Sequence, residues 1–222
     1  MDARADASSE KTYFAGVRAS DVPRTPLVAP SEYFNQYDHP SLARAAGIVF
    51  VEGIATALVL WLFVQRVIAQ VDVPPAERAE VQSAVTGAVV GVVVLLFVGW
   101  FLLAAILHVF VWFADGDRGF GTTLAVVGEA ELVGIVLLPV TGLTLLNLAG
   151  GTPSDPQAAA EFFQQAASFG TPLLLLVSFV GTCWKAVIQA VGLAESQGMD
   201  AGKAFALTVV VGLVGFLLNL AG

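Results

Sequence analysis

The chain alternates between long apolar stretches and short polar segments, and a polar region precedes the first stretch. An α-helix needs about 20 predominantly apolar residues to cross the hydrocarbon core of a bilayer. Five stretches reach that length, at about 42–65, 85–113, 123–148, 171–193 and 202–220. Prolines interrupt the pattern at 74–75 and again at 153 and 156. The pattern therefore predicts an all-α fold, in which residues 41–222 form one membrane domain, a bundle of five transmembrane helices.

Residues 1–40 form a polar N-terminal region that contains several prolines and scattered charges. They lack both the short basic and apolar opening of a cleavable signal peptide and the periodicity of an amphipathic helix. We expect this region to be a flexible polar arm. In an alternative interpretation, its aromatic side chains contact the lipid headgroup region.

The composition indicates lipid as the main solvent, because 57% of the residues are hydrophobic and only 13% are charged, whereas soluble domains are near a quarter charged. With ten basic residues and a net charge of -8, the chain lacks the basic surface that nucleic acid requires. The lone Cys183 excludes an intrachain disulfide and a cysteine metal site. No zinc-protease, phosphate-loop or nucleophile-elbow motif occurs. The sequence thus predicts no enzyme, no cofactor and no metal.

Lysine and arginine near the helix ends indicate the orientation, since cytoplasmic loops are enriched in both. Five basic residues precede or begin the first span, and the second and fourth loops carry Arg118 and Lys203, whereas the third loop has none. We therefore expect a multi-pass protein of the cell membrane with its N-terminus in the cytoplasm and its C-terminus outside.

A few ionisable or strongly polar residues lie inside the predicted spans, each roughly 10 to 20 Å from the cytoplasmic helix end at 1.5 Å per residue. They are Glu52, His108, Glu129, Glu131, Lys185 and Gln189. An intramembrane charge costs at least about 2.5 to 3.5 kcal/mol, so such side chains face the bundle interior or a cavity. Their similar depth predicts one polar cluster.

Two uses of this cluster stay open. Its carboxylates outnumber its cations, which favours a proton or cation site that opens inward. The interpretation with the greater weight is structural, with Glu52 and Lys185 paired to fix helix packing. Glu129 and Glu131 point about 200° apart on a helix, so they cannot meet the same neighbour.

Gly87 and Gly91 form a GxxxG pattern in the second predicted span. This spacing is typical of close helix packing in membranes. It predicts a helix contact, either within the chain or in a homo-oligomer.

Loop motifs between the spans resemble those of the Yip1-domain family. The first motif follows the second span: His108 is followed by a Gly-rich loop that ends in Gly119-Phe120, and then by Thr123-Leu124 and Gly128. The second motif lies before and at the start of the last span and consists of Trp184, Gly192-Leu193, Glu195, Gly198-Met199 and Lys203-Ala204. The third, Asp38-His39-Pro40, precedes the first span. Two departures occur in the third span, where the chain has Gly128-Glu129-Ala130 in place of a Gly-Tyr step and has its proline only at Pro139.

The resemblance implies five spans, a cytoplasmic N-terminus and a role outside catalysis. Eukaryotic members are associated with Rab GTPases and vesicle traffic, and the acidic composition here is similar to that of a haloarchaeal member. Two functions follow as hypotheses. The first is a membrane scaffold or adaptor for lipid, membrane-protein or cytoplasmic-protein partners. The second is a small transporter or channel for a cation or proton.

Overall fold

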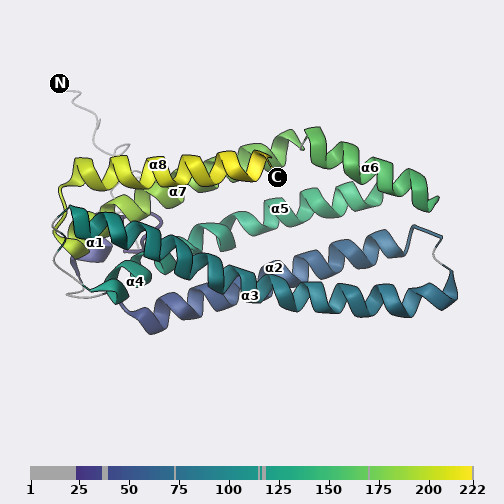
Figure 1. Cartoon of the computed structure of the whole chain (residues 1–222), viewed down its shortest axis with the longest axis horizontal. Coiled ribbons are helices and arrows are strands. Elements are labelled where there is room, and N and C mark those ends of the chain that lie inside the picture. The colour runs from purple at the N-terminus through teal and green to yellow at the C-terminus, as the bar shows by residue number, and fades with distance from the viewer. Residues whose placement is uncertain are drawn as a thin grey trace, which may run out of the picture.

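The computed structural model describes residues 24–36, 40–72, 74–114, 116, 119–169 and 171–221, and every regular element in these ranges is a helix. In chain order they are α1 (Pro30–Asn35), α2 (Leu42–Ile68), α3 (Pro75–Phe113), α4 (Phe120–Ala130), α5 (Leu132–Gly150), α6 (Pro156–Phe169), α7 (Pro172–Gln197) and α8 (Ala201–Ala221). Figure 1 shows an elongated bundle whose long helices run along its longest axis. The predicted all-α class is confirmed.

Five helical segments are long and apolar enough to cross a membrane, as predicted. They are Leu42–Ile68, Ala79–Phe113, Phe120–Gly150, Pro172–Gln197 and Ala201–Leu218. The 39 residues of α3 correspond to about 58 Å at 1.5 Å per residue, nearly twice the ~30 Å hydrocarbon core. Consequently α3 either tilts strongly or extends beyond the core.

The third span consists of two helices, α4 and α5, which are separated at Glu131. There the Glu131 N–H donates to the carbonyl of Gly128, and the Gly134 N–H donates to the carbonyl of Glu131. These are three-residue turns, tighter than the four-residue turns of an α-helix. Pro139, the proline of this span, does not cause the break, because it lies within α5. The interruption thus falls at an acidic residue inside the span.

Local residue types account for several helix ends. Ser41 precedes α2, and its hydroxyl accepts a hydrogen bond from the Arg44 N–H at 3.3 Å. Pro75 and Pro172 begin their helices, where a missing N–H costs nothing. Gly198 ends α7 with a φ of 68°, a left-handed conformation that favours glycine.

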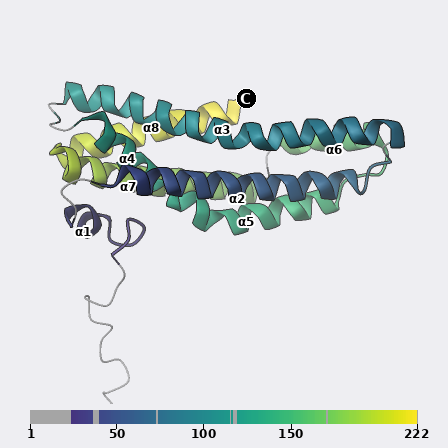
Figure 2. The ribbon, with the colours of Figure 1, turned by 90° about the horizontal axis from the view of Figure 1, so that it is seen from below.

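The two ends of the bundle differ in the helices that they contain and in how much packed core they have. At one end, the α1 end, Figures 1 and 2 place α1 and α4 beside the start of α8, while α6 lies at the other, the α6 end. The buried hydrophobic clusters draw on α1, α4 and the parts of α2, α3, α5, α7 and α8 near the α1 end. Helix α8 stops partway along the bundle (Figures 1 and 2). The packed core therefore belongs to the α1 end.

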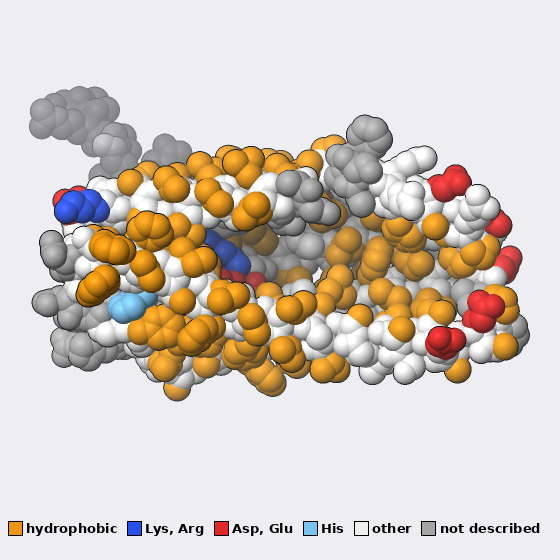
Figure 3. All heavy atoms as spheres, in the orientation of Figure 1, with side chains coloured by type: hydrophobic (Ala, Val, Ile, Leu, Met, Phe, Trp, Pro, Cys, Tyr) orange, Lys and Arg blue, Asp and Glu red, His pale blue; other side chains and the backbone are white. Residues whose placement is uncertain are grey.

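The outward faces of the long helices are apolar. Phe50, Leu95, Leu143 and Leu218 are all at least half exposed, and Figure 3 shows hydrophobic side chains over most of this face. Acidic side chains gather at the α6 end in the same view. An apolar exterior of this extent fits lipid contact.

The expectation of a flexible arm is wrong for residues 24–36. This part of the arm contains α1, whose Tyr33 and Phe34 are each only 2% exposed. The short helix escaped detection because two aromatic residues in six give no readable period, and only packing against the membrane domain stabilises it. Residues 1–23 of the predicted arm lie outside the described part of the chain.

Helix α6 is a second element that the sequence pattern did not predict. The prolines at 153 and 156 predict only a break in the pattern, yet Asp155 between them caps this helix by accepting the Ala158 N–H at 2.8 Å. Phe163 packs edge-to-face on Phe63 of α2, with ring centroids 5.9 Å apart. An acidic residue followed by proline was in fact a helix-start signal.

The predicted packing role of Gly87 and Gly91 finds no partner within the described chain. A Cβ atom built at either position meets nothing within 4 Å. The GxxxG pattern therefore does not mediate a contact between the described helices, because none of them lies within 4 Å of a Cβ atom at either glycine.

Candidate functional site

An ion cluster of Glu52, Glu131 and Lys185 lies in the interior of the bundle. The Lys185 ammonium contacts Glu131 Oε2, and its Nζ lies 3.6 Å from Glu52 Oε1. The two carboxylate side chains are 10% and 12% exposed, and that of Lys185 is 28% exposed. The cluster joins α2, α7 and the α4–α5 junction, and its formal charge is -1.

Backbone features position both carboxylates. Glu131 occupies the junction between α4 and α5, where the backbone forms tighter, three-residue turns. Gly134 follows on α5, and a Cβ atom there would lie 1.7 Å from Glu52 Oε1. Only a glycine leaves room for the Glu52 carboxylate against α5.

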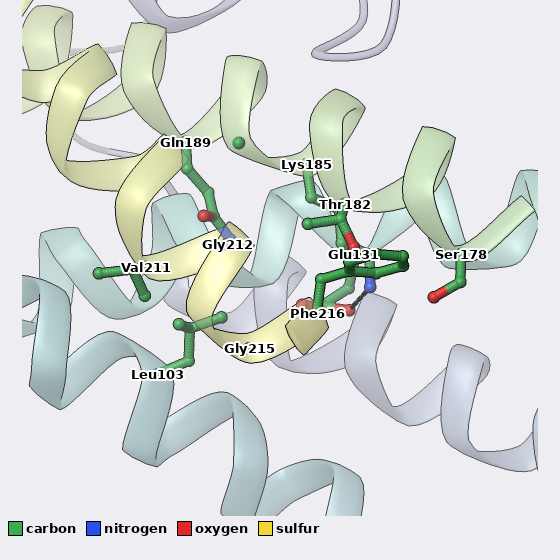
Figure 4. Close-up of a pocket in the computed structure, with 11 residues that line it drawn as sticks. Leu103, Glu131, Ser178, Thr182, Lys185, Gln189, Val211, Gly212, Gly215 and Phe216 are labelled. Carbon is green, nitrogen blue, oxygen red and sulfur yellow. Dashed lines mark hydrogen bonds and ion pairs between the residues drawn. The ribbon is translucent and has the colours of Figure 1, made fainter. Parts of the chain in front are cut away.

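Two cavities flank the ion cluster. One, of about 220 Å³, lies among α3, α7 and α8, and Glu131 and Lys185 line it. The other, of about 150 Å³, lies between α2 and α3, and Glu52, Glu131 and Trp100 line it. Figure 3 shows a hollow between α8 and α3 with basic and acidic side chains at its floor, and Figure 4 shows the lining of the larger cavity. Side chains of the ion cluster thus line both cavities.

Glu129 belongs to a separate site at the α1 end. Its side chain is fully buried, and Glu129 Oε1 lies 3.3 Å from Arg44 Nε. Tyr33 of α1 also interacts with the Glu129 carboxylate, and the Arg44 guanidinium lies 5.0 Å from the centre of the Tyr33 ring. One carboxylate therefore ties α4 to α2 and to α1.

His108 of α3 belongs to a third group of polar side chains, which lies between α3 and α4. Its Nδ1 is hydrogen-bonded to the Thr123 hydroxyl at 3.0 Å, and Thr123 also accepts from Gln197 Nε2 at 2.9 Å. The indole of Trp100 donates to the carbonyl of Leu124 at 2.9 Å. These bonds fix α4 against α3 and α7.

The structure thus divides the six predicted polar residues. It brings together Glu52, Glu131 and Lys185, with Gln189 on the cavity wall nearby. Glu129 and His108 lie in the two other groups. A single cluster was wrong because equal depth does not place side chains on the same side of a helix, and Glu129 and Glu131 point in different directions.

The loop motif residues mostly bind α1 or fix α4. Gly119 immediately precedes α4, and the Phe120 ring packs edge-to-face on His108 at 5.4 Å. On α7, the Glu195 carboxylate accepts a hydrogen bond from the Ser31 hydroxyl at 2.8 Å. Phe34 lies so close to Gly192 that a Cβ atom there would meet its ring at 2.9 Å. In addition, the indole N–H of Trp184 donates to the carbonyl of Leu27 at 3.2 Å.

Lys203 is different, because its side chain is exposed on the first turn of α8. Its backbone N–H donates to Asp200 Oδ1 at 3.0 Å, which caps the helix. This residue makes no contact with the ion cluster or with α1 that the structure records among the described residues.

Four important residues were not identified from the sequence. Arg44, Tyr33, Thr123 and Gly134 complete the three polar groups. Arg44 was treated only as a topology signal, although a basic residue within the first turn of a span is close enough to reach an intramembrane acid. Thr123 had a signal only as part of the family motif, and Tyr33 and Gly134 had none, because their partners come from distant segments.

Within the described ranges, no three side chains of His, Cys, Asp or Glu lie close enough together to hold a metal ion. The polar groups found instead are ion pairs and hydrogen bonds between helices. Five apolar spans with charges paired in their interior define a multi-pass, helical integral membrane protein.

The sequence model of the Yip1 domain matches residues 25–222, so the chain belongs to the Yip1-domain family. The match begins ahead of α1, so the docked segment is part of the family domain. No significant match was found among curated proteins or solved structures.

Proposed function

We propose that this protein is a non-enzymatic membrane scaffold or adaptor that presents its α1 end to a partner protein. The observation that carries the proposal is the docking of α1 by residues of the family motifs, Gly192 and Glu195. The contacts hold a short segment at the end of the bundle in a defined position. Such an arrangement gives a partner a rigid surface composed of α1 and the ends of the spans.

The proposal includes an orientation in the cell membrane, with the α1 end and the N-terminus in the cytoplasm and the C-terminus outside. Arg24, Arg44 and Lys203 at the α1 end support this orientation. The acidic composition of the chain supports a source adapted to high salt.

Affinity capture of the full chain from native membranes tests the adaptor role. A reproducible partner should be recovered with the wild type and lost with Phe34→Ala, which removes the ring that packs against Gly192. Val28→Ala is the matched control, because Val28 lies in the same segment and is 66% exposed. Equal recovery with Phe34→Ala and wild type would contradict a role for docked α1.

A transport function is the second candidate, supported by the excess carboxylate of the ion cluster and the cavities beside it. Against it, the linings of both cavities stop short of the α1 end, so neither reaches the cytoplasmic side of this orientation. Measurements of ion and proton flux into proteoliposomes test the transport function, comparing the wild type with the variants Glu52→Gln and Lys185→Met. Flux that depends on both residues would replace the adaptor proposal, and zero flux in all three proteins would remove transport.

A further inference from the structure

A third cavity, of about 490 Å³, lies between α2 and α5, which are in contact and run side by side along the bundle in Figure 2. Leu58 of α2 and Leu143 of α5 line it and are 55% and 65% exposed, so the cavity is open to the outside of the bundle. In a membrane crossed by these helices, that side faces lipid. Every side chain that lines the cavity is apolar.

Pro139 leaves one backbone acceptor without its partner in the wall of this cavity. In an α-helix, the carbonyl of each residue accepts from the N–H four residues further on. Pro139 lies inside α5 and has no N–H, so the carbonyl of Ile135 lacks its helical donor. This carbonyl points along the helix toward Pro139, and both residues line the cavity. Since Pro139 is exposed, the unpaired acceptor lies on the open side of α5.

The hydroxyl groups nearby on α5 bind other carbonyls. Thr141 donates to the carbonyl of Leu137 at 3.3 Å, and Thr144 donates to that of Val140 at 2.8 Å. In the part of the chain that the structure describes, no side chain donates to the carbonyl of Ile135. An unsatisfied backbone acceptor is strongly unfavourable in hydrocarbon. A donor supplied by a ligand would therefore be stabilised at this position.

The depth of the acceptor limits the kind of ligand. Pro139 lies about 16 Å from the end of the span at Gly150 and about 28 Å from its start at Phe120, at 1.5 Å per residue. The position is thus far inside a hydrocarbon core of ~30 Å. A charged headgroup is costly at such a depth. A hydroxyl group supplies a donor without a charge.

We propose that this cavity binds an uncharged lipid that carries a hydroxyl group. The hydrocarbon of the lipid fills the apolar cavity, and its hydroxyl donates to the carbonyl of Ile135. Apolar walls with one polar group that fixes the orientation are typical of a ligand site. The site is separate from the α1 end, so partner capture and lipid binding can fail independently.

Thermal unfolding of the full chain in phosphatidylcholine nanodiscs tests the site. One series of nanodiscs contains 1-hexadecanol, and the other contains hexadecyl methyl ether at the same mole fractions. The ether keeps the chain and the oxygen but has no donor. The alcohol should raise the unfolding temperature, with a half-maximal effect at about fivefold lower content than the ether, because only the alcohol gains a hydrogen bond.

Pro139→Ala tests the acceptor. The alanine N–H would donate to the carbonyl of Ile135, which satisfies this carbonyl within α5 without filling the cavity. The variant should therefore lose the preference for alcohol over ether. Pro172→Ala is the matched control, because Pro172 begins α7, where a helix needs no N–H, and it does not line the cavity. This control should keep the preference of the wild type.

Ala55→Leu tests the location, because it fills the cavity from α2. The response to both compounds should fall at least about tenfold in apparent affinity. Gly47→Leu is the control on the same helix, since a Cβ atom there meets nothing within 4 Å and Gly47 does not line the cavity.

Three results would overturn the proposal. Equal responses of the wild type to alcohol and ether, or no response to either, would show that the hydroxyl is not recognised. A preference for the alcohol that Pro139→Ala retains would exclude the carbonyl of Ile135 as the acceptor. A wild-type response in Ala55→Leu would place the binding outside this cavity.

Discussion

At the scale of residues, a glycine and a threonine determine how intramembrane polar side chains find their partners. Gly134 admits the Glu52 carboxylate to the surface of α5, and Thr123 joins His108 to Gln197. Neither residue has a charge, and each is common in membrane helices. Their importance comes from what lies opposite them in the fold.

Gly134→Ala should displace Glu52 from the ion cluster, because the new methyl group would occupy the position of Glu52 Oε1. The loss of pairing should lower the free energy of unfolding by about 1–3 kcal/mol. Denaturant titration in micelles measures it. Gly91→Ala is the control, since its Cβ meets nothing and the change should stabilise the helix by ~0.5–1 kcal/mol. Equal effects of the two substitutions would contradict the role of Gly134.

Thr123→Val keeps the shape of the side chain but removes the hydroxyl that joins His108 and Gln197. The fully buried site cannot replace these bonds with solvent, so we expect a loss of about 1–3 kcal/mol. The same titration checks it. Thr86→Val serves for comparison, because the exposed Thr86 bonds only to a carbonyl of its own helix. A neutral Thr123→Val would show that the network contributes no stability.

At the scale of elements, α1 depends on the membrane domain for its structure. Six residues are too few for a stable isolated helix. Its position rests on Tyr33 against Arg44, Ser31 against Glu195 and Phe34 against Gly192. The segment is therefore expected to be the first part of the described chain to detach.

Gly192→Ala should release α1, because the added methyl group would lie 2.5 Å from Val126 Cγ1 and 2.9 Å from the Phe34 ring. We expect trypsin to cleave after Arg24 several times faster, since cleavage requires an unfolded segment. Cleavage rates followed by mass spectrometry report this. Gly47→Ala, at an open position of α2, should cleave at the wild-type rate. An unchanged rate in Gly192→Ala would show that this contact does not hold α1.

At the scale of the whole molecule, the proposed orientation follows from the two unlike ends. Val28 lies near α1, and Ser154 precedes α6. The Asp72 N–H donates to the Ser154 carbonyl at 2.9 Å, which joins the two loops at the α6 end.

In intact cells, a membrane-impermeant maleimide should label Ser154→Cys from outside and should label Val28→Cys only after permeabilisation. Both variants are made with Cys183→Ser, because Cys183 is a free, exposed thiol. Labelling is detected by the mass shift of the purified chain. The opposite pattern would reverse the orientation and place the α1 end outside the cell.

The membrane class, the all-α fold and the approximate limits of the five spans can all be predicted from the amino-acid sequence. Continuous apolar length is a local property, and in lipid it admits almost no structure but a helix. The sequence also identified Glu52, Glu131 and Lys185 as intramembrane charges, since a charged residue within an apolar span is recognised from its position alone.

The tertiary structure alone decided which of these charges meet. It separated Glu129 and His108 from the ion cluster, ordered α1 against α7 and left Gly87 without a partner. Pairing depends on the rotation of each helix about its axis and on contacts between residues far apart in the chain. Neither quantity is contained in hydropathy or residue spacing, because both arise only when the helices pack.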